Sequence, residues 1–221
     1  METKTDSGAG NSAELEHILR DRISRHEIAP GSKLREVALA DEFSVSRARV
    51  RLALQSLEGQ GLVEHALNRG YNVKRLNSSE LFHLYDTFEV LEGLSARLAV
   101  ENSPGWDWAP LAQAFDQKLK ERVAADDFDA MFDAIMFYRR EVNQAAANST
   151  LDGFLRSIYD RVHMIIRRTL LLPGRAEESL QQHRLIIAAI QNGDGQSAEE
   201  LKRENMRSAR QQIREHIELM L

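Results

Sequence analysis

Residues 30–73 constrain the fold of this chain more than any other segment, because turn and helix signals follow one another there at short intervals. Pro30-Gly31 predicts a turn, and a short helix is expected over 36–42. Ser46 is a good N-cap for a second helix. Two helices joined so closely predict a helix-turn-helix. Its buried residues would be Val37, Leu39 and Ala40 in the first helix and Val50, Ala53, Leu54 and Leu57 in the second.

A two-stranded wing is predicted to follow the second helix. Leu62-Val63 and Tyr71-Asn72-Val73 are short and rich in residues that favour strands. Asn68-Arg69-Gly70 between them predicts a turn, with a glycine where a positive φ is expected. Apolar residues at helical spacing over 13–27 add one more helix in front of the motif.

Basic side chains gather where such a fold meets DNA. Arg47, Arg49 and Arg51 follow the N-cap in the first two turns of the second helix, the end that a recognition helix points at base edges. An arginine fork bonds guanine O6 and N7 together and also binds phosphates. The alternative, a merely solvated surface, suits one isolated arginine better than this group. The candidate DNA-binding residues are Arg35, Ser46, Arg47, Arg49 and Arg51, with Asn68, Arg69 and Gly70 at the wing tip.

The charge distribution supports DNA binding by the first domain, although the total charge of −5 alone does not. Residues 1–76 carry 12 basic and 11 acidic side chains, whereas residues 77–221 carry 17 basic and 23 acidic ones. A local basic surface on an acidic protein keeps non-specific DNA binding weak, because the acidic part repels phosphates.

The rest of the chain is predicted to be a second, all-helical domain. Six helical segments are expected, over 79–102, 108–126, 128–147, 150–172, 175–192 and 195–221. We therefore expect a mainly α protein with a disordered tail over 1–12, a winged helix-turn-helix over 13–76 and a six-helix domain over 77–221. The chain has no cysteine and no apolar run long enough to span a membrane. A polar N-terminus without a signal-peptide pattern adds the expectation of a cytoplasmic protein.

The first domain resembles the winged helix-turn-helix of the GntR family of bacterial transcriptional regulators, over about Leu15 to Val73. The resemblance lies in Pro-Gly-x-x-Leu-x-Glu at 30–36, in Ser-Arg-x-x-Val-Arg-x-Ala-Leu at 46–54 and in Asn-Arg-Gly at 68–70. Arg49 departs from the pattern, because many relatives have proline there, and it adds a cation at the surface that would face DNA.

The helical domain resembles the FCD effector domain of the FadR-type branch, through Leu91-Glu92-Gly93, Gln182-His183-Arg184 and Gly193-Asp194. Many FCD domains bind a divalent metal through one Asp and three His. The four matching positions here are Ala134, Tyr138, His183 and Asn205. These residues are a poor ligand set, and Asp133 is one residue out of register. We therefore expect no metal or other cofactor.

Tyr138, His183 and Asn205 are expected to converge inside the helical domain, and two interpretations stay open. They form either a hydrogen-bonded core cluster or a metal-free pocket for a small effector. Phe88 stands near the place where relatives would carry a carboxylate-binding arginine, which puts the usual organic-acid effector in doubt.

The expected function is a sequence-specific transcriptional regulator, a repressor, controlled by a small-molecule effector. It would be a homodimer that reads a pseudo-palindromic operator in double-stranded DNA, because two-fold symmetry doubles the contacts of one small domain. One alternative is a DNA-binding regulator with a degenerate sensor that binds a protein partner or no ligand. A metal-dependent enzyme is a weaker alternative, since the chain lacks a ligand set, a nucleophile motif and a phosphate loop. No catalytic residue and no metal ligand are therefore assigned.

Overall fold

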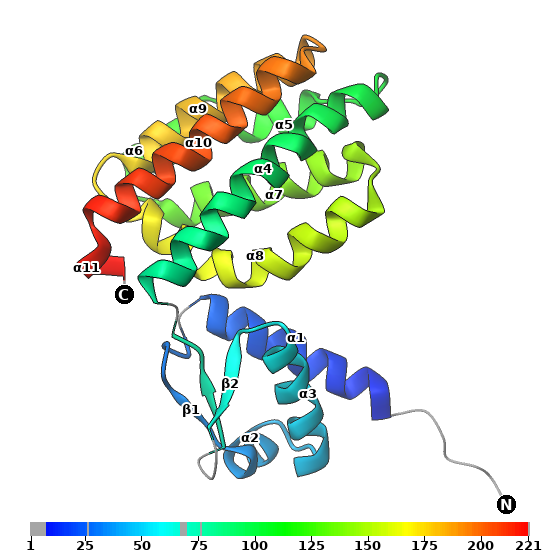
Figure 1. Cartoon of the computed structure of the whole chain (residues 1–221), viewed down its shortest axis with the longest axis vertical. Helices are drawn as coiled ribbons and strands as arrows, with labels where there is room; N and C mark the ends of the chain where they lie inside the picture. The colour runs from blue at the N-terminus through cyan, green and yellow to red at the C-terminus, as the bar shows by residue number, and fades with distance from the viewer. Residues whose placement is uncertain (1–7, 26, 67–69, 76, 221) are drawn as a thin grey trace, which may run out of the picture. The chain divides into compact units, whose positions relative to one another are not determined.

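The computed structural model describes residues 8–25, 27–66, 70–75 and 77–220 (Figure 1). The chain divides into two compact units, Met1–Leu76 and Asn77–Leu221. None of the described helices is both long and apolar enough to cross a lipid bilayer.

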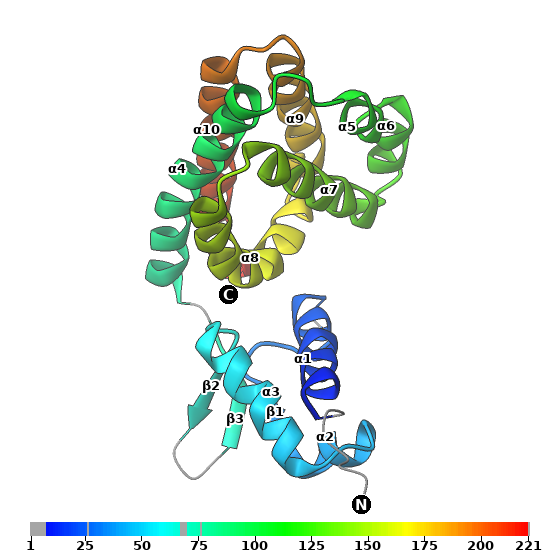
Figure 2. The same ribbon diagram turned by 90° about the vertical axis from the view of Figure 1, so that its right-hand side faces the viewer.

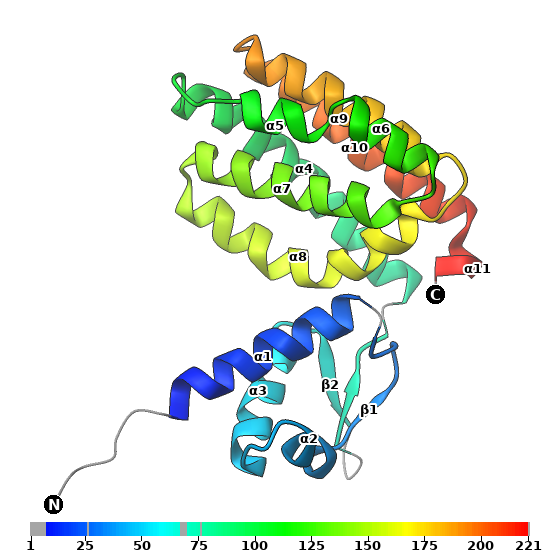
Figure 3. The ribbon, with the colours of Figure 1, turned by 180° about the vertical axis from the view of Figure 1, so that it is seen from behind.

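Three helices and a small antiparallel sheet make up the first unit. In chain order the elements are α1 (Gly8–Ser24), β1 (Lys33–Leu34), α2 (Glu36–Glu42), α3 (Arg47–Gly59), β2 (Val63–Ala66) and β3 (Gly70–Val73). Helix α1 packs along α3 (Figure 3). The core is formed by Leu15, Leu19 and Ile23 of α1, by Val50, Ala53, Leu54 and Leu57 of α3, and by Leu34, Val63, Tyr71 and Val73 of the sheet.

The sheet has three strands in the order β1-β3-β2, not the two predicted. Lys33 and Leu34 pair with Asn72 and Tyr71. The turn that brings this strand to the sheet depends on Gly31, which has φ +85°. This backbone angle favours glycine, because L side chains rarely adopt it.

Two more expectations for this unit are corrected. The disordered tail expected over 1–12 is wrong for residues 8–12, because α1 begins at Gly8; one more turn on an existing helix avoids the cost of nucleation, even with glycines in it. Residues 1–7 lie outside the described residues. Val37 is 54% exposed, although it was expected in the core. Helix α2 has only two turns, and Leu39 and Ala40 fill its buried side.

The second unit is all helical, and its predicted segments divide further. The helices are α4 (Ser78–Asn102), α5 (Ala109–Ala114), α6 (Gln117–Ala124), α7 (Phe128–Ala146), α8 (Ser149–Leu170), α9 (Arg175–Gln191), α10 (Gly195–Glu215) and α11 (Ile217–Met220). The segment expected over 108–126 breaks because the Asp116 carboxylate caps α6 through the N–H groups of Lys118 and Leu119. Arg184 then donates to the main-chain oxygens of Phe115 and Asp116 at 2.7 and 2.6 Å.

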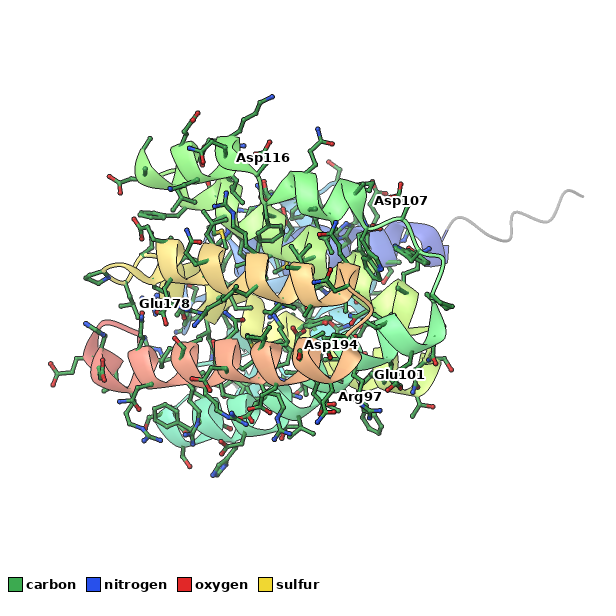
Figure 4. The ribbon with its side chains drawn as sticks, turned by 90° about the horizontal axis from the view of Figure 1, so that it is seen from above. Arg97, Glu101, Asp107, Asp116, Glu178 and Asp194 are labelled. Carbon is green, nitrogen blue, oxygen red and sulfur yellow. The ribbon has the colours of Figure 1, made fainter. Side chains whose placement is uncertain are left out.

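Helices α4, α7, α8, α9 and α10 surround the core of this unit (Figure 2). Helix α10 lies between α4 and α9 and packs on both. Figure 4 labels Arg97 and Glu101 near the end of α4 and Asp194 at the start of α10. Arg97 binds Glu199 at 2.7 Å, and the Asp194 side chain caps α10. The Arg97–Glu199 pair therefore joins the last turns of α4 to the start of α10.

Candidate DNA interface and effector cavity

Helix α3 begins as the sequence predicts. Ser46 has an extended backbone, and its hydroxyl oxygen accepts a hydrogen bond from the N–H of Arg49 at 3.4 Å. One side of the helix is buried in the core. The other side is exposed and carries Arg47, Ala48, Arg51, Leu52 and Gln55. The described part of the motif therefore presents the N-terminal half of α3 to solvent, as a recognition helix requires.

Two of the predicted arginines share a carboxylate on the neighbouring helix. Arg51 donates from Nε and Nη2 to Oε1 and Oε2 of Glu36, at 2.8 and 2.7 Å. Nη2 of Arg47 lies 3.7 Å from the same Oε2. The hydrogen bonds from Arg51 lower the pKa of the Glu36 carboxyl, so it is charged at neutral pH. The first residue of α2 thus sets the position of arginines on α3.

Arg49 lies on a different side of α3. Successive residues of an α-helix are about 100° apart, so Arg49 is about 200° from Arg47, whereas Arg51 is only about 40° away. The exposed strip between the arginines holds Ala48 and Leu52, whose side chain is 57% exposed. The three arginines therefore flank an apolar strip, a surface that suits contact with a thymine methyl group.

The remaining predicted DNA contacts are placed less completely. Arg35 is exposed and precedes the first residue of α2, next to Glu36. Gly70 begins β3 with φ +77°, as expected for the wing turn. Asn68 and Arg69 lie outside the described residues, so their role in the minor groove stays a prediction.

A cavity lies inside the second unit, with an internal volume of about 30 Å³. That volume holds about two water molecules. Every residue around it is buried. Its polar lining residues are Arg139, Thr169, Arg175, Ser179, His183, Lys202 and Asn205, and its apolar ones are Tyr85, Phe88, Ile135, Ile166, Leu170, Met206 and Ala209.

The cavity wall carries more positive than negative charge. Lys202 Nζ binds Oε2 of Glu92 at 3.0 Å, and Nε of Arg139 lies 3.3 Å from Oε1. Tyr159 donates its hydroxyl to the same Oε1 at 2.8 Å. Burial lowers the pKa of Lys202 to about 8, and Glu92 limits that fall. Burial would raise the pKa of Glu92, but Lys202 and Arg139 hold it below its ordinary value.

Arg175 adds a third buried cation, and a second guanidinium, to this wall. It is 3% exposed and donates to Gln182 Oε1 at 3.0 Å. Its Nη1 also lies 3.4 Å from Oε2 of Glu178, whose side chain is 38% exposed. Three cationic side chains therefore reach the cavity against one fully buried carboxylate, Glu92.

The three predicted pocket residues do come together. The rings of Tyr138 and His183 meet edge to face at 5.1 Å. Asn205 donates to Gln182 at 2.6 Å, and Lys202 lies 3.4 Å from its side-chain oxygen. However, only His183 and Asn205 line the cavity; Tyr138 packs behind them. The sequence-based group is therefore one side of a larger cluster.

His183 faces the cluster as a neutral base. Its Nδ1 lies 2.8 Å from the main-chain oxygen of Ser179, which assigns the ring proton to Nδ1. Burial and the charge of Lys202 lower the pKa of His183 well below its ordinary value. Nε2 of His183 and the hydroxyl of Tyr138 are buried without a hydrogen-bond partner. Buried polar atoms of this kind need a water or a ligand.

The predicted group omitted Glu92, Arg139, Arg175 and Lys202, although helix periodicity points to most of them. Lys202 stands between Ala198 and Met206, four residues from each, on the buried side of α10. Arg139 follows Ile135 by four residues on α7, and Glu92 follows Phe88 by four on α4. A charged residue in an apolar stripe is the signal that finds such a cluster.

The metal site of FCD relatives does not fit these residues. At the four matching positions, Ala134 has no donor and Tyr138 and Asn205 are poor ligands. The ammonium of Lys202 lies over the Tyr138 ring at 4.7 Å. At neutral pH the positive charge at this point repels a divalent cation. Within the described part of the chain, no three His, Asp or Glu side chains are grouped to hold a metal.

Two family models match this chain. Residues 11–73 match the model described as "Bacterial regulatory proteins, gntR family". Residues 83–219, more than half of the chain, match the model described as "FCD domain".

Curated relatives and solved structures agree with these matches. The HTH-type transcriptional repressor GlaR of Escherichia coli is 24% identical, over 85% of this chain and 89% of the relative. The HTH-type transcriptional repressor RspR of the same species is 26% identical, over 97% and 94%. The structure titled E. coli McbR/YncC has a TM-score of 0.80 at 20% identity and covers 94% of this chain and 98% of its own. This likeness supports the two-unit fold.

Proposed function

Since this chain belongs to the gntR family of bacterial regulatory proteins and carries an FCD domain, we propose how it reads DNA and what controls it. The chain is a DNA-binding transcriptional regulator with an effector-binding domain. The finer proposal is a homodimeric repressor that works in the bacterial cytoplasm, where the operator lies, and that has no enzymatic activity of its own.

The DNA contacts proposed are base contacts from Arg47, Arg49 and Arg51, with Arg35 and the wing tip on the backbone and the minor groove. The exposed N-terminal half of α3 is the observation that supports this assignment. A duplex selected by the protein from a random pool identifies the operator. Two inverted half-sites, about one helical turn apart, are expected in it. A single half-site bound by a monomer would contradict the dimeric proposal.

The effector proposed is a small organic anion that binds the cavity without a metal. The observation that carries this is the excess of buried positive charge from Arg139, Arg175 and Lys202 over Glu92. Phe88 thus does not remove the means to bind a carboxylate, because other residues supply cations. The apolar side of the cavity suits the carbon skeleton of the ligand.

The cavity holds about two waters in this conformation, so a larger ligand must widen it. A ligand that binds the widened form more tightly shifts the protein toward that form, and this shift is the proposed control of DNA affinity. The small volume also favours the alternative interpretation, a core cluster that senses nothing.

A thermal-shift screen against small carboxylates, at constant ionic strength, separates these alternatives. A sensor is expected to be stabilised by at least one of them and to change its operator affinity in parallel. His183→Ala should then reduce the response while the affinity for DNA without ligand stays nearly unchanged. A core cluster would instead give a lower melting temperature in His183→Ala and no response in either protein. Elemental analysis tests the metal: one zinc, nickel or manganese per chain would contradict the metal-free proposal.

A further inference from the structure

The paired hydrogen bonds between Glu36 and Arg51 have a consequence for base reading. We propose that Glu36 is a positioning residue, which fixes the Arg51 fork for one base pair and so contributes to operator specificity. The inference rests on the DNA-reading role proposed above for Arg51. It goes beyond that role, because Glu36 itself need not touch DNA.

The donors of Arg51 divide cleanly between protein and solvent. A guanidinium has five N–H donors. Glu36 takes one from Nε and one from Nη2, at 2.8 and 2.7 Å. The three that remain belong to the other edge of the fork, Nη1 and Nη2. That edge is the one that can bond guanine O6 and N7 together.

Glu36 holds the Arg51 side chain in place before DNA is bound. The Arg51 side chain is 53% exposed, so without a partner it would occupy many rotamers. The Glu36 side chain is only 19% exposed and begins α2, so it is a fixed anchor. Ordering a side chain during binding reduces affinity, and an already ordered side chain avoids that loss. Glu36 therefore favours the base pair that matches one orientation of Arg51.

The carboxylate also changes the charge that DNA meets. Arg47 and Arg51 are four residues apart on α3, where like charges repel each other. Glu36 lies between them, 3.7 Å from Arg47 and 2.7 Å from Arg51. It offsets part of their charge and repels phosphates. Removal of this carboxylate should therefore strengthen binding to DNA of any sequence and reduce discrimination between sequences.

Two substitutions at this position separate orientation from charge. Glu36→Asp keeps the charge and the acidic residue in the first turn of α2, but its shorter side chain cannot reach both Arg51 nitrogens. Glu36→Gln removes the charge. Glu42→Gln is the matched control, because Glu42 ends the same helix and pairs with Arg22 at 2.6 Å instead. Arg51→Ala tests the role on which the inference rests.

The full-length variants are compared on a duplex selected by the wild type and on a scrambled duplex, over a range of salt concentrations. Discrimination is the ratio of the affinity for the selected duplex to the affinity for the scrambled duplex. We expect this ratio to fall about fivefold or more in Glu36→Asp and in Glu36→Gln. Glu36→Gln alone should bind the scrambled duplex more tightly and steepen the salt dependence by about one phosphate contact. Glu42→Gln should keep the wild-type ratio.

If Glu36→Asp discriminates between the duplexes like the wild type while Arg51→Ala loses discrimination, the inference is overturned and the proposed DNA contacts stay intact. Wild-type discrimination in Arg51→Ala would overturn the proposed contact itself. A purely structural role for Glu36 predicts equal losses on both duplexes and a lower melting temperature in both Glu36 variants. That pattern would also overturn the inference.

Discussion

The two units of this protein use cation–carboxylate pairs in opposite surroundings. Arg47, Arg51 and Glu36 lie at the surface, where water screens their interaction. Lys202, Arg139 and Glu92 are at most 3% exposed, so water screens them very little. Exposed pairs contribute little stability and mainly orient side chains. Buried pairs are strongly coupled, and the loss of one partner leaves an uncompensated charge. The same chemistry therefore positions exposed arginines of α3 in one unit and surrounds an internal cavity with charge in the other.

The largest effect is expected from Glu92, a carboxylate that is 3% exposed and pairs with Lys202 and Arg139. Glu92→Gln should lower the free energy of unfolding by about 3–5 kcal/mol, because it leaves Lys202 and Arg139 without their counter-ion. Lys202→Met removes one of the excess cations and should change stability by about 1 kcal/mol or less. Urea unfolding of both variants at equal protein concentration checks the difference. Equal losses of unfolding free energy in Glu92→Gln and Lys202→Met would contradict the excess of buried positive charge at the cavity.

The recognition arginines should affect DNA binding and not folding. Arg47→Ala and Arg51→Ala should each weaken operator binding by roughly 1–3 kcal/mol and relax one position of the site. Both side chains are more than half exposed, so the melting temperature should stay close to that of the wild type. Binding titrations on operators with single base changes provide the measurement. A uniform loss on every sequence would reassign the arginine to phosphate.

Lys202 should give the second unit a distinct pH dependence. Its pKa is about 8 in the folded protein and about 10.4 in an unfolded chain. Between these values the unfolded chain binds more protons, so stability rises with pH. Relative to Lys202→Met, the wild type should gain about 2 kcal/mol between pH 7.5 and 9.5. Parallel stability curves for the two proteins would show that Lys202 does not titrate in this range.

The smallest effect is expected from the exposed ion pairs of Arg97, one within α4 and one to α10. Arg97 binds Glu199 and Glu101 with its side chain 36% exposed. Arg97→Ala should cost less than about 1 kcal/mol, because solvent screens these pairs. Thermal unfolding in low and high salt checks this. A loss as large as that of Glu92→Gln would remove the contrast between surface and interior.

Local signals in the sequence predict much of this fold. Asn77, Asp127, Asn148 and Asp194 each cap a helix of the second unit, close to the breaks expected from the chain alone. The break at Asp116 is not predicted, although its carboxylate caps α6 in the same way; only the contact from Arg184 to its main-chain oxygen is distant in sequence. Strand β1 was missed because two residues carry no periodicity.

The candidate sites divide in the same way. The N-cap and arginines of α3 follow from local residue types, so their placement could be predicted. The cavity depends on Glu92, Arg139, Arg175 and Lys202, which come from four helices. Apolar periodicity treats such residues as exceptions, and the metal positions of FCD domains match Ala134, Tyr138, His183 and Asn205 instead. Only the tertiary structure brings their charges together.

The most direct test of the account is whether a small anion controls DNA binding through Lys202. Operator affinity and melting temperature of the wild type and Lys202→Met would be measured in parallel with a panel of small carboxylates and with neutral analogues of the same size, in buffer treated with a chelator. At least one carboxylate is expected to stabilise the wild type and to change its operator affinity. The neutral analogues should have no effect, and Lys202→Met should not respond. A response shared by Lys202→Met, a response only to neutral analogues, or no response to any carboxylate would contradict the account.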